Sequence, residues 1–496
     1  MPLVPFAAFG PDRSPFDSSY CDRVENVLPI QGGWGPFPSF RALPGVAPLP
    51  ELPPMGAALV YVSNGAYRLF AGTQHHLYML NTGTLAWDDK SKAGGYSGAV
   101  GIRWGMTQYG DSFLASNGQD NPQWIDVTTA TAFADMPTAP KAYNIDAVGD
   151  FVFLSHLQSN QRMCQWSGLN QPFFWTPRQQ SSDFQAFPDG GEIMGTASSP
   201  NGLVIFSAES IREGTLALET PLVFNFKVSV PNHGCLAPKS IISTGEGIFY
   251  YSDDGFYKYA NPPTPIGLER IDKWFLDNVA ADAIYDMYGG EDPIRKIVYW
   301  AFQSRNNALA ATFDKILLYH YSLDQWSLLN PGILLTGMID ATYVGKTLDG
   351  LNSIGDLDHL PFSLDSRAWS GSTPVVAAFD QNGYLGFFDE GNPPMQAILQ
   401  TGDAQLNEAT RTMIFGWRPL TDAATLQGNV ATKEYPGDTP RWRSYIGNNR
   451  VGIIPQQVSG LFHRFELTIP STQTNPQYWT AAHGLEPIDA QPDGEQ

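Results

Sequence analysis

The sequence predicts an all-β protein built as a β-propeller of about six to eight blades. Three observations predict this fold: a glycine that recurs about every 45 residues, a recurring pair of aromatic residues, and a composition suited to tight turns. The 496 residues include 48 Gly and 39 Pro, and 13% are aromatic whereas only 16% are charged. Aromatic residues favour strands, and Gly and Pro favour turns. A chain of this length is too long for one ordinary domain unless that domain is built by repetition.

Five glycines open equivalent segments of the chain. Each stands in a polar turn and is followed by a short run of strand-forming residues. These glycines are Gly65, Gly110, Gly149, Gly202 and Gly247, at spacings of 45, 39, 53 and 45 residues. Such a spacing is typical of propeller blades made of four short strands. One blade cannot bury both of its faces alone, so we expect neighbouring blades to pack face to face.

An aromatic pair follows the glycine in several of these units. The pairs are nine residues apart in three units and two residues closer in a fourth, which predicts a hairpin with one aromatic on each arm. They are Tyr78 with Trp87, Trp124 with Phe133, Trp166 with Trp175, and Tyr319 with Trp326. Because the five tryptophans recur with the repeat, we interpret them as packing between blades and not as sugar-stacking platforms.

Three regions are expected along the chain. Residues 1–55 are rich in proline, which interrupts central strands and helix interiors, so they should form an extended arm on the surface of this subunit or of a neighbour. Residues 56–400 should form the propeller. Residues 401–496 should form a C-terminal β-rich domain, since the stretch Leu461–Ile469 alternates in the manner of a strand.

One helix is expected to interrupt the propeller between the fifth and sixth units. Within residues 269–288, Ile271, Phe275 and Val279 are spaced four residues apart. This spacing places them on one face of an amphipathic helix. Asp292-Pro293 would follow the helix before the next strand begins.

Motifs for catalysis, cofactors or metals are missing from the sequence. It contains no His-Glu-x-x-His, no phosphate-binding Gly-x-x-x-x-Gly-Lys-Ser/Thr and no Gly-x-Ser-x-Gly. His75-His76 would point to opposite faces of a strand and are expected in a surface turn. Asp88-Asp89 and Asp253-Asp254-Gly255 lack the spacing of a calcium loop and are expected in hairpins. We therefore expect no enzyme and no catalytic, cofactor-binding or metal-binding residue.

The cysteines and the charge narrow the class of protein further. Cys21, Cys164 and Cys235 lie far apart and cannot all pair, so we expect buried or incidental thiols and no disulfide framework. No apolar run approaches the roughly 18 residues of a membrane-spanning helix. Met1–Gly10 has no basic region before its apolar stretch, which favours synthesis in a cytoplasm. The net charge of −20 argues against tight sequence-independent binding of nucleic acid, but a surface past which DNA slides is still compatible with it.

Three motifs resemble tail proteins of short-tailed bacteriophages. The first runs from Arg23-Val-Glu-Asn-Val-Leu-Pro-Ile30 to Gly33-Trp-Gly-Pro-Phe-Pro-Ser39 and resembles the opening of those proteins. The stretch from Asp272-Lys-Trp-Phe275 to Val298-Tyr-Trp300 is similar to their helix followed by a strand. The ending, from Gly460-Leu-Phe-His-Arg-Phe465 to Trp479-Thr-Ala-Ala-His-Gly484, resembles their closing motif. The resemblance covers most of the chain in order and includes two subgroups, the tubular tail nozzle and the related hub that stabilises packaged DNA.

This resemblance implies a structural virion protein, made in the host cytoplasm and located in the tail. It implies a homohexameric ring that continues the DNA channel below the adaptor and portal, retains and then passes the double-stranded genome without sequence-specific binding, and seats fibres or spikes. The main alternative is a propeller that binds or cleaves carbohydrate, because propellers can bring carboxylates from different blades to one central cleft. A cellular scaffold propeller is a third hypothesis.

Overall fold

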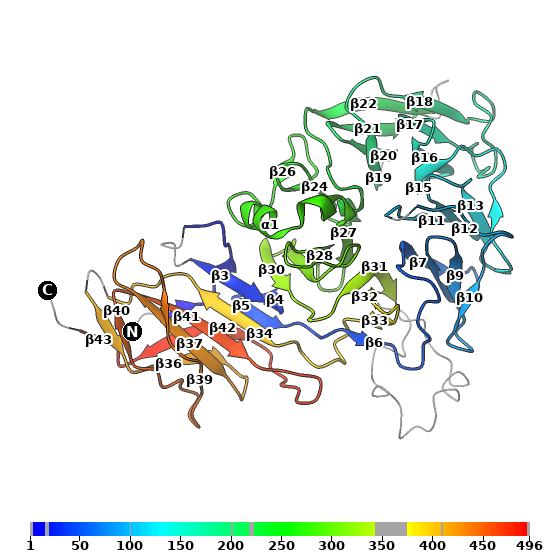
Figure 1. Cartoon of the computed structure of the whole chain (residues 1–496). Helices are drawn as coiled ribbons and strands as arrows, with labels where there is room; N and C mark the ends of the chain where they lie inside the picture. Colours follow the sequence, from blue (N-terminus) through cyan, green and yellow to red (C-terminus); the bar gives the residue numbers. More distant parts are fainter. Residues whose placement is uncertain are drawn as a thin grey trace.

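Seven blades of four strands each surround a common axis (Figure 1); six of them are separate four-stranded sheets, and the sixth blade is part of a larger, 11-stranded sheet. The computed structural model describes residues 3–14, 19–99, 101–199, 202–217, 223–342, 374–407 and 410–493, and every structural statement below concerns these residues. The predicted all-β propeller is therefore confirmed. Within the described residues, no helix is both long and apolar enough to cross a membrane.

The strands of the first four blades run in sequence order. The first blade consists of β7 (Gly56–Tyr61), β8 (Tyr67–Gly72), β9 (Leu77–Leu80) and β10 (Trp87–Asp89), and the second of β11 (Gly105–Tyr109), β12 (Ser112–Ser116), β13 (Gln123–Asp126) and β14 (Ala134–Asp135). The third consists of β15 (Ala142–Val148), β16 (Phe151–Leu157), β17 (Asn160–Trp166) and β18 (Asp183–Ala186), and the fourth of β19 (Ile193–Ser199), β20 (Gly202–Ser207), β21 (Ser210–Leu216) and β22 (Phe224–Pro231).

The last blade takes its outer strand from the beginning of the chain. The fifth blade consists of β23 (Ile242–Thr244), β24 (Gly247–Tyr251), β25 (Phe256–Lys258) and β26 (Thr264–Pro265), and the sixth of β27 (Tyr288–Asp292), β28 (Ile297–Phe302), β29 (Lys315–His320) and β30 (Gln325–Leu329). The seventh consists of β31 (Leu335–Thr342), β32 (Pro374–Asp380), β33 (Leu385–Phe387) and β6 (Arg41–Ala42). The first strands of the blades line the axis, and β31 contacts β7, so the ring is closed.

The repeated glycines occupy one structural position. Each of the five lies in or beside the hairpin turn that joins the first two strands of a blade, and each has a positive φ angle. At Gly202 a Cβ atom would lie 2.1 Å from the carbonyl oxygen of Gly214 on β21, so a side chain is excluded there. The period in the sequence therefore reflects a turn conformation that glycine adopts most readily.

Aromatic side chains pack between neighbouring blades, as expected. The Phe70 and Phe113 rings stack across the first and second blades with 4.7 Å between their centroids. Trp87 lies 5.7 Å from Phe379 of the seventh blade by the same measure. Such aromatic contacts add to the free energy gained by burying the rings.

The hairpin predicted at Trp166 and Trp175 is wrong in its second arm. Trp166 lies on β17, but the strand beside it is β18, where Asp183 is its register partner. Trp175 lies in the preceding loop, buried between the second and third blades. An aromatic at the expected spacing therefore fills an inter-blade gap without belonging to a strand.

The N-terminal segment is not the expected surface arm. It forms β1 (Val4–Pro5), β2 (Ala8–Phe9), β3 (Tyr20–Glu25), β4 (Val27–Ile30), β5 (Gly33–Pro36) and β6, and its Val24 and Trp34 side chains are fully buried. Pro5 and Pro29 are tolerated because they lie on β1 and β4, which are end strands of their sheet.

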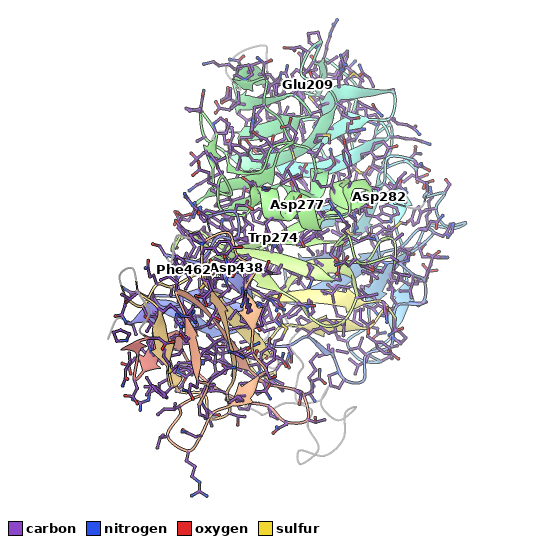
Figure 2. The ribbon with its side chains drawn as sticks, turned by 60° about the vertical axis from the view of Figure 1, so that its left-hand side comes forward. Glu209, Trp274, Asp277, Asp282, Asp438 and Phe462 are labelled. Atoms are coloured by element: carbon purple, nitrogen blue, oxygen red, sulfur yellow. The ribbon has the colours of Figure 1, made fainter. Side chains whose placement is uncertain are left out.

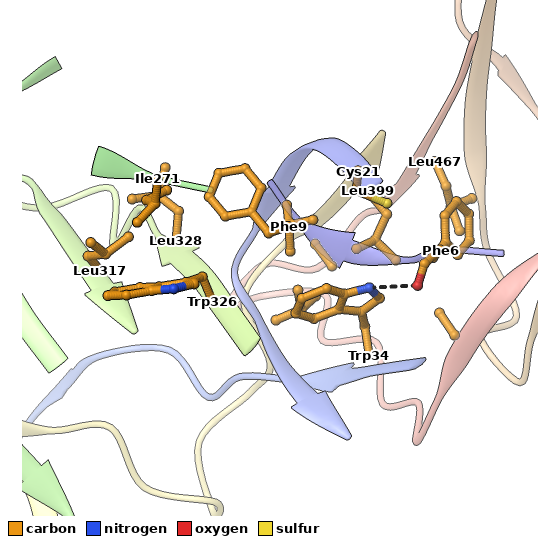
Figure 3. Packing of buried hydrophobic residues seen from close by; sticks show 14 of the residues in the cluster. Phe6, Phe9, Cys21, Trp34, Ile271, Leu317, Trp326, Leu328, Leu399 and Leu467 are labelled. Atoms are coloured by element: carbon orange, nitrogen blue, oxygen red, sulfur yellow. Dashed lines mark hydrogen bonds between the residues drawn. The ribbon is translucent and has the colours of Figure 1, made fainter. Parts of the chain in front are cut away.

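The C-terminal region shares its sheets with this segment. It comprises β34 (Ala397–Thr401), β35 (Thr412–Ile414), β36 (Gly416–Thr421), β37 (Gln427–Lys433), β38 (Arg441–Trp442), β39 (Ile446–Gly447), β40 (Val458–Gly460), β41 (Phe462–Ile469), β42 (Ala482–Ile488) and β43 (Gln491–Pro492). β3 pairs with both β30 of the sixth blade and β34, so one 11-stranded sheet extends from the propeller to β38. Figure 3 shows the core that spans this junction, where the Trp34 indole Nε1 donates a hydrogen bond of 3.1 Å to the Phe6 carbonyl oxygen.

The single helix expected over residues 269–288 is divided in two. The structure has α1 (Asp272–Asn278) and the 3-10 helix η2 (Ala281–Asp286), besides the short η1 (Pro238–Ser240). Val279 adopts an extended conformation and forms a bridge with Ser304, which interrupts the helix. Ile271, Phe275 and Val279 are buried, as predicted. Figure 2 labels Trp274 on α1, and its ring lies 5.9 Å from that of Phe9 on β2.

Candidate functional site

A pocket of about 310 Å³ lies at the axis of the propeller. Most of its walls come from the first strands of the blades or from the segments that lead into them, and His156 on β16 and Gln161 on β17 complete the lining. The lining residues are Gly101, Ile102, Arg103, Tyr143, Asn144, His156, Gln161, Glu192, Met194, Pro238, Lys239, Tyr285 and Asp286. The pocket therefore combines contributions from the second to the fifth blade with η2, and we call it the axial pocket.

Arg103 forms the inner end of the axial pocket. Its Nη2 donates a hydrogen bond of 3.3 Å to the Asp286 carbonyl oxygen, and its guanidinium carbon lies 5.3 Å from the centre of the Phe313 ring. Its Nε is buried without a hydrogen-bond partner in the described chain. Burial lowers the pKa of Arg103, although the negative charge of Asp286 opposes this effect. Arg103 also lines a cavity of about 20 Å³ bounded by Pro54, so it separates two spaces along the axis.

Lys239 is the second cation of the axial pocket and lies in η1. Burial lowers its pKa, the negative charge of Asp146 raises it, and the positive charge of Arg103 lowers it further. No hydrogen bond joins the Lys239 ammonium to another group in the described parts of the chain, and no carboxylate oxygen there lies within 4.0 Å of Lys239 or Arg103. The hydroxyl of Thr196 donates a hydrogen bond to Asp146, and burial raises the pKa of that carboxyl.

The rim of the axial pocket is polar and open to solvent. Tyr285 is 53% exposed, and Gln161 is exposed as well. His156 is held in place because its Nδ1–H donates a hydrogen bond of 2.7 Å to the Ile193 carbonyl oxygen. The carboxylate of Glu192 completes the rim. This arrangement can hold a small charged molecule, since convergent polar groups in a concave site fix the orientation of a ligand.

A second candidate site lies on the outermost edge of the C-terminal sheet. Its residues are exposed side chains on or near β38 and β39, both of which pair with β37. We call it the arginine–aromatic surface, and it consists of Tyr435, Arg441, Trp442, Arg443, Tyr445, Ile446, Arg450 and Val451. Among the described residues, Arg443 and Arg450 have no carboxylate within 4.0 Å. Exposed Trp, Tyr and Arg side chains are typical of protein interfaces.

The histidine pair and the second aspartate pair are placed as the sequence predicted, whereas Asp88 and Asp89 lie on strand β10 and not in a hairpin turn. His75 and His76 lie at the turn between β8 and β9, and their Nδ1 atoms are 2.6 Å and 2.9 Å from carboxylate oxygens of Glu51 and Asp89. Asp253-Asp254-Gly255 lies in the hairpin between β24 and β25. In the part of the chain that the structure describes, no three His, Cys, Asp or Glu side chains gather as metal ligands would.

The cysteines and tryptophans are largely internal. Cys21, Cys164 and Cys235 are free and buried, and burial raises the pKa of the Cys21 thiol to about 12. Trp87, Trp166, Trp175 and Trp326 are buried, and Trp124 is half-buried with its ring 4.7 Å from that of Phe173. None of the five lines the axial pocket.

Sequence reasoning missed both cations of the axial pocket. Arg103 precedes β11 by two residues, and Lys239 precedes β23 by three. Aligning the units on their glycines would have placed both residues just before the first strand of a blade, which is the strand that lines the axis. Neither belongs to a recognised motif, so only the repeat itself carried a signal.

The chain has only a limited similarity to known proteins. No protein-family model matches the chain, and no curated protein matches it. Among solved structures, BamB from Moraxella catarrhalis is 9% identical, with a TM-score of 0.39, over 73% of this chain and 93% of that one. The structure of YCF48 bound to D1 peptide is 12% identical, with a TM-score of 0.35, over 73% of this chain and 97% of that one. At these scores the propeller assignment depends on the strand topology.

Proposed function

We propose that this chain is a structural subunit of the tail of a short-tailed bacteriophage, either the nozzle or the related hub that stabilises packaged DNA. Six copies form a ring below the adaptor and portal, retain the genome, pass it during ejection and seat fibres or spikes. The sequence motifs that resemble such proteins motivate the proposal. The structural observation that supports it best is the 11-stranded sheet shared by the propeller and the C-terminal region.

A shared sheet suits a subunit that must hold its shape under load. Domains joined only by side-chain contacts usually move relative to each other. Here β3 is hydrogen-bonded in the same sheet as β30 of the sixth blade and β34 of the C-terminal region. The core around Trp34 and Trp326 is continuous across the junction. Relative motion would therefore require backbone hydrogen bonds to break and buried aromatic groups to separate.

The arginine–aromatic surface is the part of the subunit that we assign to contact with a neighbouring copy. The chain carries a net charge of −20, so a second copy presents an acidic partner to Arg441, Arg443 and Arg450. Opposite charges on different parts of the same subunit favour a head-to-tail contact, which closes into a ring when the rotation is right. Trp442 and Tyr445 would supply the apolar area of this interface.

In this proposal DNA passes through the centre of the ring and not along the axis of a propeller. Arg103 separates the two cavities on that axis, and the axial pocket has only about 310 Å³ of space. We expect the lumen of the ring to carry more Asp and Glu than Lys and Arg, because an acidic wall repels phosphate and lets DNA move without sticking.

Light scattering on the full chain after size exclusion tests the proposal. A hexamer has a mass of about 330 kDa, against 54.4 kDa for the single chain. The double variant Arg443→Glu/Arg450→Glu should shift the protein towards smaller species. Lys227→Glu, a matched charge reversal at an exposed position of β22, should leave the ring intact. A protein that is monomeric at every concentration and absent from purified virions contradicts the proposal.

A further inference from the structure

We infer that the axial pocket is a binding site for the anionic group, a carboxylate or a phosphate, of a small molecule. This inference does not depend on the ring, because every residue of the pocket belongs to one propeller. Two cations converge on the pocket from different blades, Arg103 from the segment before β11 and Lys239 from η1.

Most hydrogen-bond donors of these two cations have no acceptor in the described part of the chain. A guanidinium has five N–H donors and an ammonium has three. Within the described residues, these two side chains together make a single hydrogen bond. It runs from Arg103 Nη2 to the Asp286 carbonyl oxygen. Arg103 Nε is buried without any acceptor. A buried charged donor such as this Nε is costly in free energy unless it is partnered, and the half-buried Arg103 and Lys239 side chains face the pocket, so this site favours an acceptor that enters the cavity.

The neighbouring carboxyl groups do not replace that acceptor. Asp146 already accepts a hydrogen bond from Thr196, and burial raises the pKa of its carboxyl. Asp286 offers Arg103 its backbone carbonyl, and no oxygen of its carboxylate comes within 4.0 Å of either cation. Glu192 lines the same pocket without forming an ion pair with Lys239 or Arg103 in the described structure. The two positive charges also repel each other, which an anion between them would relieve.

The size of the axial pocket limits the ligand. Its volume of about 310 Å³ is at the lower end of the range for small-molecule sites, so it suits a compact ligand and excludes a polymer such as DNA. The exposed side chains of Tyr285 and Gln161 mark the entrance. Tyr143 and His156 add polar groups that can contact the rest of the molecule.

Isothermal titration calorimetry on the full chain tests the inference with inorganic phosphate, succinate and the neutral polyol erythritol. We expect saturable binding of at least one anion, with one site per chain, and no binding of erythritol. Lys239→Met should weaken anion binding about tenfold or more, the effect of losing a hydrogen bond to a charged group. Lys227→Met, which removes the same charge at an exposed position of β22, should leave the affinity unchanged. Binding of phosphate alone or succinate alone identifies which group the site selects.

Crystals of the unsubstituted chain soaked with tungstate, an electron-dense oxyanion, give a test that does not rely on a variant. An anomalous peak within hydrogen-bonding distance of Arg103 and Lys239 supports the inference. Absence of a peak there overturns it. The inference is equally wrong if neither anion binds saturably, or if Lys239→Met and Lys227→Met bind alike, because the pocket then holds only solvent.

Discussion

Replacing Trp34 with alanine should strongly destabilise the protein, because this residue links the N-terminal segment to the C-terminal sheets. Its side chain has no solvent-exposed area and belongs to the cluster that also contains Trp326 of the sixth blade. Substitution of a buried Trp by Ala typically costs about 3–5 kcal/mol of unfolding free energy. The Phe6 carbonyl oxygen would also lose the indole N–H that lies 3.1 Å away. We therefore expect a loss near the upper end of that range.

Urea unfolding followed by circular dichroism measures this effect, with the shift in midpoint multiplied by the slope of the transition. Trp34→Phe keeps most of the ring and loses the N–H, so we expect a loss of about 1–2 kcal/mol. Trp442→Ala, at a position that is 40% exposed, should change stability by about 0.5 kcal/mol or less. If Trp34→Ala were as mild as Trp442→Ala, the segment would behave as a surface arm and the argument for a shared core would fail.

Three further predictions follow from the same structure. Gly202→Ala should destabilise the protein more than Gly65→Ala in urea titrations, because a Cβ at Gly202 would lie 2.1 Å from the Gly214 carbonyl oxygen, whereas none of the described atoms lies within 4 Å of a Cβ at Gly65. Gly65→Ala should cost only the roughly 1–2 kcal/mol of a left-handed conformation. Equal losses of stability in the two variants would refute this difference. The three buried cysteines should not react with Ellman's reagent in the native protein and should all react after unfolding; fast reaction of any native thiol contradicts their burial. Burial lowers the pKa of His463 to about 4 from an ordinary value near 6.5, so the unfolded chain binds a proton that the folded chain does not, and stability should fall by about 3 kcal/mol between pH 6.5 and pH 4. His463→Gln should lack this component, and identical pH dependence in the two proteins would show that His463 does not titrate as described.

Local sequence patterns predicted the propeller, whereas the pairing of strands far apart in the chain could not be predicted from the sequence. The glycine of each hairpin is required by its own turn, so it recurs in the sequence wherever the turn recurs in the fold. Besides β2, β3 pairs with β30 and β34, which lie some 300 or more residues away, and no local pattern identifies these two strands. The proline content of residues 1–55 indicated an arm because end strands that tolerate proline cannot be told from loops without the sheet.

The candidate site residues also differ in how far the local sequence predicts their placement. The placement of His75 and His76 in a turn followed from local chemistry. The axial pocket depends on Arg103 and Lys239, which are brought together only when the ring of blades closes. The arginine–aromatic surface lies in residues 401–496, whose β character was predicted but whose pairing with the propeller was not.

Electron cryo-microscopy of intact virions tests the proposed function most directly. We predict six copies of this chain in a ring below the adaptor, with the arginine–aromatic surface of one copy against the next and an acidic lumen. Mass spectrometry of the same particles should then detect peptides of the chain. Virions that lack those peptides, or a tail ring whose density does not fit a seven-bladed propeller joined to the C-terminal sheets, would contradict the account.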